Sequence, residues 1–292
     1  MLRERLFAGS ILAAAIGGVL VVDSHLWPFF PCLFVVALLA GVYSTRELVL
    51  LMPVEIRPSL PLCTFSALGV LAANWYYPLT HAQPNHLPLP HFADPWHPVF
   101  LTFTAVVIVA FLFEMHRYRE PGRSVVRIAL TVWTVAYLAL LPSFFLRMRW
   151  FDGGLDTTLS SWMLAVTIFV PKCGDIGAYF TGKSIGRIPF APVLSPKKTW
   201  EGFIGGLLVS VITAVGVGEF VPLFRYGMSE AVAFGVVVGV VAVLGDLAES
   251  LIKRDCQAKD AAKSIPGFGG FLDVIDSVLF AGPVAYVWLA RN

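Results

Sequence analysis

The sequence has few charged residues and few cysteines, and it contains no internal repeat and no low-complexity segment. Charged residues make up 14% of its 292 residues, and 57% are hydrophobic, whereas roughly 25% of a soluble globular chain is charged. The four cysteines lie far apart and form no CxxC pair, so neither a zinc site nor a disulfide framework is indicated. A formal net charge of +2 gives no sign of nucleic-acid binding. These absences exclude a soluble domain, a disordered chain and a disulfide-rich secreted module.

Long apolar runs bounded by charged residues are abundant instead. A helix needs about 20 apolar residues to cross a bilayer. We therefore expect an all-α, polytopic membrane protein with about nine transmembrane helices, at Leu6–Val22, Leu26–Tyr43, Leu60–Tyr77, Pro98–Phe113, Ile128–Leu146, Leu159–Phe180, Phe203–Phe224, Ala231–Gly245 and Phe271–Ala290. The first run follows two arginines, as a signal peptide would, but a second apolar run comes directly after it. We interpret the first run as an uncleaved signal-anchor helix.

The distribution of basic residues predicts the orientation of these spans. With the N-terminus inside, only four of the 21 lysines and arginines lie outside: Arg147, Arg149, Arg225 and Arg291. We therefore predict an N-in, C-out protein of the cytoplasmic (plasma) membrane. The longest outside loop, Pro78–His97, contains four histidines, but its prolines and its lack of cysteines favour an irregular loop over a metal site.

The two halves of the chain differ in where their polar residues lie. Up to about residue 170 the charges lie in the predicted loops, whereas later polar residues enter or flank the apolar runs. Ionisable residues at membrane depth are expensive and are therefore candidates for function. We predict scaffold helices in residues 1–160 and a catalytic region with cytoplasmic loops in residues 161–292.

One segment in this region matches a phosphate-binding pattern by coincidence. Gly177–Ser184 fits GxxxxGK[ST], but that loop functions only between a strand and a helix. Here the segment completes an apolar run and is followed by Gly186 and Pro189. Asp175, within the same run, is interpreted as a polar site residue rather than a charge at a helix end.

A second segment, Ser195–Thr199, predicts a helix start at the cytoplasmic edge of the membrane. Ser195 followed by Pro196 is typical of an N-cap and a first helical turn. Lys197, Lys198 and Thr199 would then add to the positive end of the helix. The alternative is an ordinary positive-inside anchor, but the hydroxyl groups that flank the lysines favour anion binding.

The third segment, residues 245–276, is the most informative. At 100° per residue, one narrow helical arc contains Asp246, Glu249, Ser250, Lys253 and Gln257. The stretch Pro266–Gly270 cannot be helical. After it, Asp273 and Asp276 lie on one face of the last span, among apolar neighbours.

This collection of residues indicates phosphate chemistry. Asp246, Asp273 and Asp276 supply hard oxygen ligands suited to Mg²⁺, which would relieve their mutual repulsion. Basic residues that could bind phosphate accompany them: Lys253, Arg254, Lys259, Lys197 and Lys198. Metal, lysines and a glycine-rich backbone are the apparatus of phosphoryl or nucleotidyl transfer. Because the site lies at the membrane edge, we predict one lipid-borne and one water-soluble substrate.

The same residues resemble the signature of the phosphatidate cytidylyltransferases (CDP-diacylglycerol synthases), which runs S-x-x-K-R, K-D, P-G-H-G-G and D-R-x-D. The corresponding segments here are Ser250–Arg254, Lys259-Asp260, Pro266–Gly270 and Asp273–Asp276. Upstream blocks of that family match at Asp175, Ala178-Tyr179, Gly182, Gly186, Ser195–Thr199 and Glu201-Gly202. The resemblance covers roughly residues 170–290.

The resemblance implies that CTP and phosphatidate react to give CDP-diacylglycerol and pyrophosphate, with Mg²⁺ as cofactor and a second cation left open. It implies catalytic roles for Asp246, Asp273, Asp276, Lys253 and Arg254, the three aspartates also binding metal. The substrate-binding residues that it implies are Asp175, Ser195, Lys197, Lys198, Thr199, Glu249, Ser250, Lys259, Asp260, Gly267, Gly269 and Gly270. Members of the family are embedded in the lipid bilayer and are often homodimeric.

Two positions depart from the signature, and three alternatives stay open. Phe268 replaces the signature histidine and Val274 the signature arginine, so a role assigned to either side chain is absent here. The nearest alternative is a CTP-dependent polyprenol or lipid kinase. An ion-coupled transporter and an inactive relative retained as a partner subunit are the others.

Overall fold

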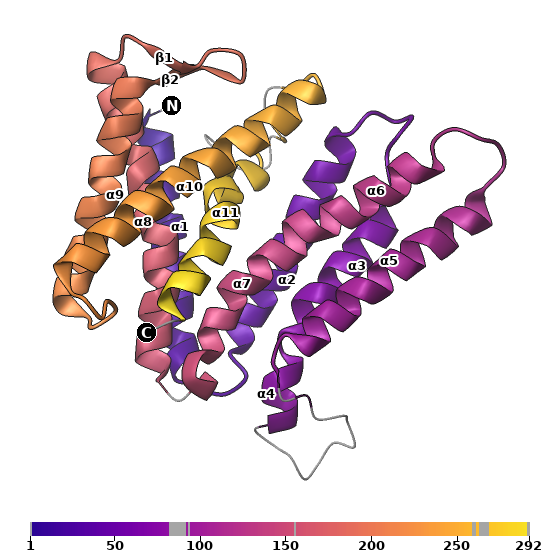
Figure 1. Cartoon of the computed structure of the whole chain (residues 1–292), viewed down its shortest axis with the longest axis horizontal. Helices are drawn as coiled ribbons and strands as arrows, with labels where there is room; N and C mark the ends of the chain where they lie inside the picture. Colours follow the sequence, from indigo (N-terminus) through magenta and orange to yellow (C-terminus); the bar gives the residue numbers. More distant parts are fainter. Residues whose placement is uncertain are drawn as a thin grey trace. The chain divides into compact units, whose positions relative to one another are not determined.

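The computed structural model describes residues 2–81, 92, 94–154, 156–258, 261–262 and 269–290, and it is mostly helical (Figure 1). The first half of the chain forms α1 (Leu2–Ser24), α2 (Pro31–Leu51), α3 (Leu60–Ala73), α4 (Tyr76–His81), α5 (His97–Arg117), α6 (Ser124–Val135), the π-helical η1 (Ala136–Leu140) and α7 (Leu141–Arg147). The second half forms the 3₁₀ helix η2 (Met148–Gly154), α8 (Thr157–Ile185), β1 (Pro189–Ala191), β2 (Ser195–Thr199), α9 (Trp200–Phe220), α10 (Met228–Asp255) and α11 (Leu272–Leu289).

Within the described residues, seven helices are long and apolar enough to cross a membrane. They are Pro31–Leu51, His97–Arg117, Ser124–Phe151, Thr157–Ile185, Trp200–Phe220, Met228–Asp255 and Leu272–Leu289. The other two predicted spans coincide with shorter apolar helices, Gly9–Ser24 and Leu60–Ala73. The expectation of a helical, multi-pass membrane protein is therefore confirmed, whereas the count of nine spans and the orientation of the termini stay predictions.

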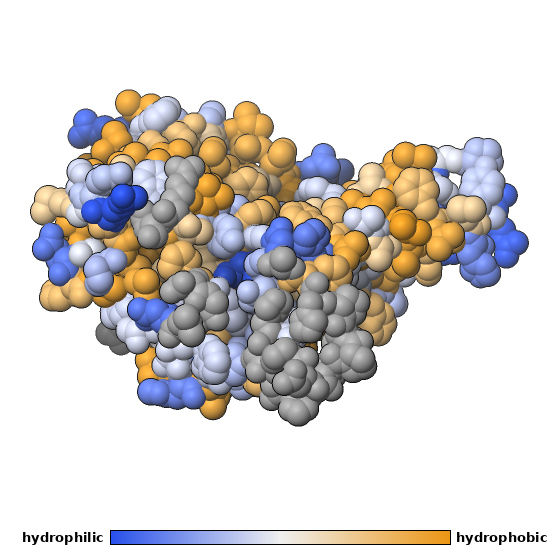
Figure 2. All heavy atoms as spheres, turned by 60° about the horizontal axis from the view of Figure 1, so that its bottom comes forward, coloured by the Kyte–Doolittle hydropathy of each residue, from blue (hydrophilic) through white to orange (hydrophobic). Residues whose placement is uncertain are grey.

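Large apolar side chains cover much of the surface of these helices. Figure 2 shows them as broad orange areas on the face in view. On α5, Ile108, Phe111 and Met115 are 56%, 52% and 69% exposed. Soluble monomers rarely expose apolar patches of this extent. Surfaces of this kind suit contact with lipid, where a helix satisfies its own backbone hydrogen bonds.

By packing, the chain divides into two units, each described here by itself. The first comprises Met1–Leu146 with Asp260–Leu272, and the second comprises Arg147–Lys259 with Asp273–Asn292. The predicted boundary between residues 160 and 161 separated scaffold helices from a catalytic region, so this division by packing does not test it. Of the described candidate residues, Gly269 and Gly270 belong to the first unit and all the others to the second.

In the first unit, α2 begins at Pro31 rather than at the predicted Leu26. Residues 25–29 form turns, and Phe30 adopts a left-handed conformation with φ of 41°. The Asp23 carboxylate then accepts hydrogen bonds from the backbone N–H groups of Cys32 and Leu33, at 3.0 and 2.6 Å. These N–H groups have no partner within the helix, so Asp23 acts as a cap supplied from α1.

In the second unit, a short antiparallel hairpin separates α8 from α9, so the fold is not purely helical. Pro189 pairs with Thr199, and Ala191 with Ser195. The predicted helix start at Ser195 is therefore wrong. Pairing with β1 keeps Ser195–Thr199 extended, and the Thr199 hydroxyl accepts the N–H of Gly202 at 3.1 Å as the N-cap of α9.

Helix α8 runs without a break from Thr157 to Ile185, with Pro171 inside it. The stretch Gly177–Ser184 is therefore helical. A phosphate loop needs a strand before it and free backbone N–H groups, so the reading of that pattern as a coincidence is confirmed.

Small residues bring α8 and α9 into close contact. A Cβ atom at Gly206 of α9 would lie 2.8 Å from the carbonyl oxygen of Gly174 and 2.9 Å from the Cβ of Ala178, both on α8. Close approach of two backbones through small residues is a typical mode of helix association in membranes. The glycine at this position therefore sets the distance between the two helices.

We predict that Gly206→Val destabilises the protein because the added side chain overpacks this contact, at a cost of about 1–3 kcal/mol. Gly216→Val is the matched control, since it makes the same change in the same helix at a position where a Cβ would meet nothing within 4 Å. Thermal unfolding in detergent should show a lower melting temperature for Gly206→Val alone. Equal melting temperatures would contradict the packing described here.

Candidate functional site

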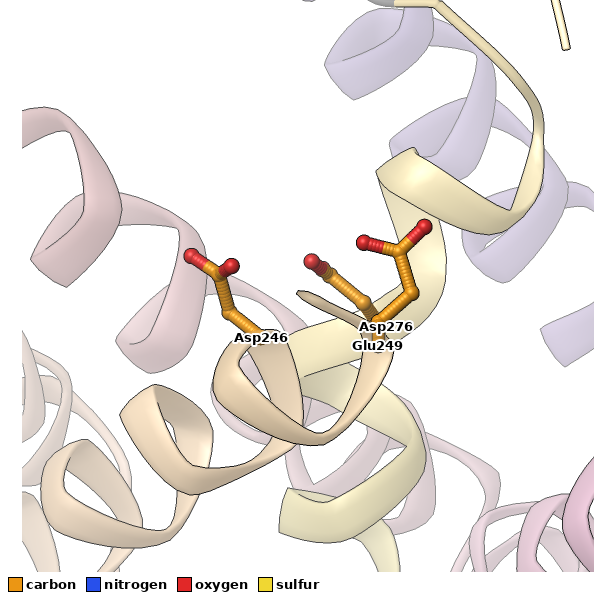
Figure 3. Close-up of side chains that lie close together, drawn as sticks. All are labelled: Asp246, Glu249 and Asp276. Atoms are coloured by element: carbon orange, nitrogen blue, oxygen red, sulfur yellow. The ribbon is translucent and has the colours of Figure 1, made fainter. Parts of the chain in front are cut away.

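Three carboxylates from two helices of the second unit form the centre of the site (Figure 3). Asp246 and Glu249 lie one turn apart on α10, and Asp276 lies on α11. One oxygen from each residue lies within 4.8 Å of the other two. Glu249 and Asp276 are buried, while Asp246 is partly exposed. The predicted convergence of carboxylates from these two helices is thus present in the structure.

Lysines pair with these carboxylates from three separate elements. Lys198, on β2, lies with its Nζ 2.6 Å from Oδ2 of Asp246. Lys253, one turn beyond Glu249 on α10, donates to Oε2 of Glu249 at 2.5 Å. The Nζ of Lys172, on α8, is 3.5 Å from Oδ1 of Asp276. Each carboxylate of the centre therefore has a lysine neighbour.

Asp273 is not a member of this trio, which differs from the predicted metal ligands. Its Oδ1 lies 2.6 Å from Nζ of Lys253, so this lysine bridges α10 and α11. Asp273 lies three residues before Asp276 on α11, and its partner Lys253 lies four residues after Glu249 on α10. In place of Asp273, the structure brings Glu249 together with Asp246 and Asp276.

Lys172 was interpreted only as a basic residue of an inside segment, and the structure places it within the site. Its Nζ donates to Oγ of Ser277 at 2.7 Å and lies 3.3 Å from Oδ2 of Asp175. The Ser277 hydroxyl in turn donates to Asp175 at 3.1 Å. The spacing of Lys172 and Asp175, three residues apart in an apolar run, was the signal that could have indicated this pair.

The charges of this site do not balance. Asp175, Asp246, Glu249, Asp273 and Asp276 are accompanied by three lysines, which leaves a formal charge of −2 on these eight groups. The Oε1 atom of Glu249 is buried and has no hydrogen-bond partner among the described residues. Carboxylate oxygens are the ligands that Mg²⁺ prefers. Asp246, Glu249 and Asp276 therefore fit a divalent cation in both charge and donor type.

The other described candidates on the second unit surround this centre or lie apart from it. The Ser250 hydroxyl lies 3.5 Å from Oδ1 of Asp246. Arg254 is directed elsewhere, donating to the carbonyl oxygens of Leu194 and Ala258. Lys197 is exposed on β2, Ser195 is half-buried, and Thr199 caps α9. The structure therefore groups Ser250 with the acidic centre and Arg254 with the turn of the hairpin.

The glycine-rich segment is described only in part. Lys259, Asp260, Gly267 and Phe268 lie outside the described residues, as does most of the histidine-rich loop. Gly269 has φ of 108°, which only glycine adopts readily. A Cβ at Gly270 would lie 2.7 Å from Oε2 of Glu47. Backbone conformation at Gly269 and lack of space at Gly270 therefore explain why glycine stands at these positions. Their contact with substrate stays a prediction.

Val274, which replaces the signature arginine, is 8% exposed. An apolar side chain suits this buried position.

The family model and the related proteins that match this chain are all cytidylyltransferases. The model of the cytidylyltransferase family matches residues 3–291. A phosphatidate cytidylyltransferase of Synechocystis is 33% identical over 68% of this chain and 72% of its own length. Proteins of the same name from Staphylococcus aureus and Thermotoga maritima are 32% and 30% identical. They cover 70% and 67% of the chain, and 75% and 70% of their own lengths.

We predict that Lys172→Met lowers the stability of the second unit by about 1–3 kcal/mol, because Asp175 and Asp276 lose the cation between them. Adding Asp175→Asn to this variant should restore part of the loss. Lys183→Met, an exposed change on the same helix, is the control. Melting temperatures of the four proteins test this. If the double variant is no more stable than Lys172→Met alone, the pairing is not the cause.

Proposed function

This chain belongs to the cytidylyltransferase family, and from this premise we propose that it transfers the cytidylyl group of CTP to phosphatidate. The products are CDP-diacylglycerol and pyrophosphate. The observation that carries the proposal is the acidic centre of Asp246, Glu249 and Asp276, which brings three hard oxygen donors together. It lies in a site whose acids outnumber its lysines by two. The names of the related proteins favour this reaction over transfer of the terminal phosphate or transport of an ion.

We further propose that a divalent cation, Mg²⁺, binds to Asp246, Glu249 and Asp276. The unpartnered Oε1 of Glu249 supports this assignment, because a buried carboxylate oxygen without a partner is costly. Bound there, the ion would neutralise negative charge on the nucleotide phosphates and on the leaving pyrophosphate.

In the proposed reaction, a phosphate oxygen of phosphatidate attacks the α-phosphorus of CTP. The new P–O bond forms as the bond between the α-phosphorus and the oxygen bridging to the β-phosphorus breaks, and pyrophosphate leaves with that electron pair. A phosphate monoester has its second pKa near 6, so the attacking oxygen is ionised at neutral pH. No protein base is needed for this step, which agrees with the replacement of the signature histidine by Phe268.

The chain's own side chains would bind and orient the substrates. Lys198 is already at the acidic centre, and Lys197 is exposed two strand positions from Thr199, so both suit contact with phosphate oxygens. Lys253 holds Glu249 and Asp273 in fixed positions through two short ion pairs. Lys172 does the same for Asp175 and Asp276.

We place the site on the cytoplasmic side of a multi-pass membrane protein. The excess of basic residues in the predicted inside segments supports this orientation, and CTP is a water-soluble nucleotide of the cytoplasm. The homodimer implied by the family resemblance stays a prediction.

We predict that the purified protein transfers radiolabel from α-³²P-labelled CTP to the lipid fraction when phosphatidate and Mg²⁺ are present, because the α-phosphate stays with the lipid product. Label from γ-³²P-labelled CTP should appear in pyrophosphate. The cation is tested by its removal with a chelator and its restoration. Label entering lipid only from the γ-position would instead identify a lipid kinase.

We predict that Asp246→Asn, Glu249→Gln and Asp276→Asn each reduce this activity by at least about a hundredfold, because each removes a charge from the proposed metal site. Asp273→Asn should be milder, since its carboxylate pairs with Lys253 rather than joining the trio. Glu219→Gln, an exposed change on α9, is the control. Near-normal activity of the first three variants would rule out the assigned site.

A further inference from the structure

The first unit contains a buried carboxylate whose contacts lead to the beginning of α11. Glu47 lies near the C-terminal end of α2, and only 6% of it is exposed. Its Oε1 accepts a hydrogen bond from the backbone N–H of Phe271 at 2.9 Å, and its Oε2 accepts one from that of Leu272 at 2.8 Å. One side chain thus binds two consecutive N–H groups that lie 224 and 225 residues further along the chain.

These two N–H groups are ones that a helix cannot satisfy by itself. Leu272 is the first residue of α11, and the first N–H groups of any helix have no intrahelical partner. A negative charge is also favourable at this end of a helix, and hydrogen bonds to a carboxylate are stronger than those to a neutral acceptor. Glu47 is therefore a cap for α11 that α2 supplies.

The neighbours of Glu47 fit the same contact. Tyr43 lies one turn earlier on α2, and its ring centre is 6.5 Å from that of Phe271. A Cβ at Gly270 would lie 2.7 Å from Oε2 of Glu47, so the absence of a side chain there leaves room for the carboxylate. One face of α2 therefore holds the three residues Gly270–Leu272 directly before the acidic part of α11.

Leu272 is bonded to Asp273, and Asp276 follows one turn later. We propose that Glu47 is a positioning residue for these two carboxylates. By fixing the first turn of α11, it sets the position in which Asp273 meets Lys253 and Asp276 joins Asp246 and Glu249. This inference rests on the proposed function, and it gives a role in metal binding to a helix that the sequence assigned to the scaffold.

Glu47→Gln tests the proposal with Asp23→Asn as its matched control. The amide keeps one acceptor oxygen but turns an NH₂ group toward the second N–H donor. Asp23→Asn makes the same change in a buried carboxylate that caps two consecutive N–H groups at the other end of α2. Glu47 lies about 22 Å along the axis of α2 from Cys32 and Leu33. Both variants therefore lose a cap, but only Glu47→Gln affects α11.

Two measurements separate positioning from general stability. Hydrogen–deuterium exchange of a peptide covering residues 269–276 reports on the cap itself. Its backbone amides should exchange faster than in wild type in Glu47→Gln, and at the wild-type rate in Asp23→Asn. The binding of Mn²⁺, followed by the loss of its free electron paramagnetic resonance signal, reports the carboxylates without any assay of activity. We expect the Mn²⁺ Kd to rise at least about fivefold in Glu47→Gln and to stay within about twofold of wild type in Asp23→Asn.

Equal Mn²⁺ affinity in the two variants would overturn the positioning role even if exchange at residues 269–276 increases. Failure of the wild-type protein to bind Mn²⁺ would instead reject the proposed metal site, and the positioning role with it. If Glu47→Gln does not fold, Glu47→Asp carries the comparison. It keeps the charge but shortens the side chain by one methylene, so its Kd should lie between those of wild type and Glu47→Gln. A wild-type Kd for Glu47→Asp would overturn the role.

Discussion

Carboxylates placed in membrane-spanning helices have to be neutralised, and this requirement organises the site. An ionised group removed from water costs several kcal/mol unless a partner compensates it. Five acids gather in the second unit, and three lysines compensate only part of their charge. Two of the lysines are each shared by two acids, and the oxygens of Asp246, Glu249 and Asp276 converge within this group. A divalent cation is the simplest group that restores neutrality there and that also suits chemistry on phosphates.

Contacts between the helices of the second unit bring these acids and lysines together. Helix α10 presents its polar arc to α11, and Lys253 joins the two helices by binding an acid on each. Close packing of α8 against α9, through small residues such as Gly206, sets the frame from which Lys172 enters the site and the hairpin carries Lys198 to Asp246. In the first unit, the Glu47 carboxylate accepts hydrogen bonds from the N–H groups of Phe271 and Leu272, directly before Asp273.

Local patterns predicted the helices and the polar face of α10, because a period of 3.6 residues and a run of apolar side chains are visible in any single segment. They did not determine the rotation of α11 against α10, which pairs Asp273 with Lys253 and puts Glu249 in the trio. The predicted span Leu159–Phe180 contained Lys172, but the sequence did not show that its side chain meets Asp276 of another helix. Ser195-Pro196 suits a helix start as well as a strand, and only pairing with Pro189–Ala191 decides between them. Glu47 is a lone acid in sequence, and its partners are more than 200 residues away.

The central claim is that the acids of α10 and α11 share one divalent cation, and anomalous scattering from crystals soaked in Mn²⁺ tests it most directly. The account predicts a strong peak within coordination distance of Asp246, Glu249 and Asp276, and its loss in a crystal of the Asp276→Asn variant. No peak at this trio, or a peak bound only by Asp175 and Asp273, would contradict it.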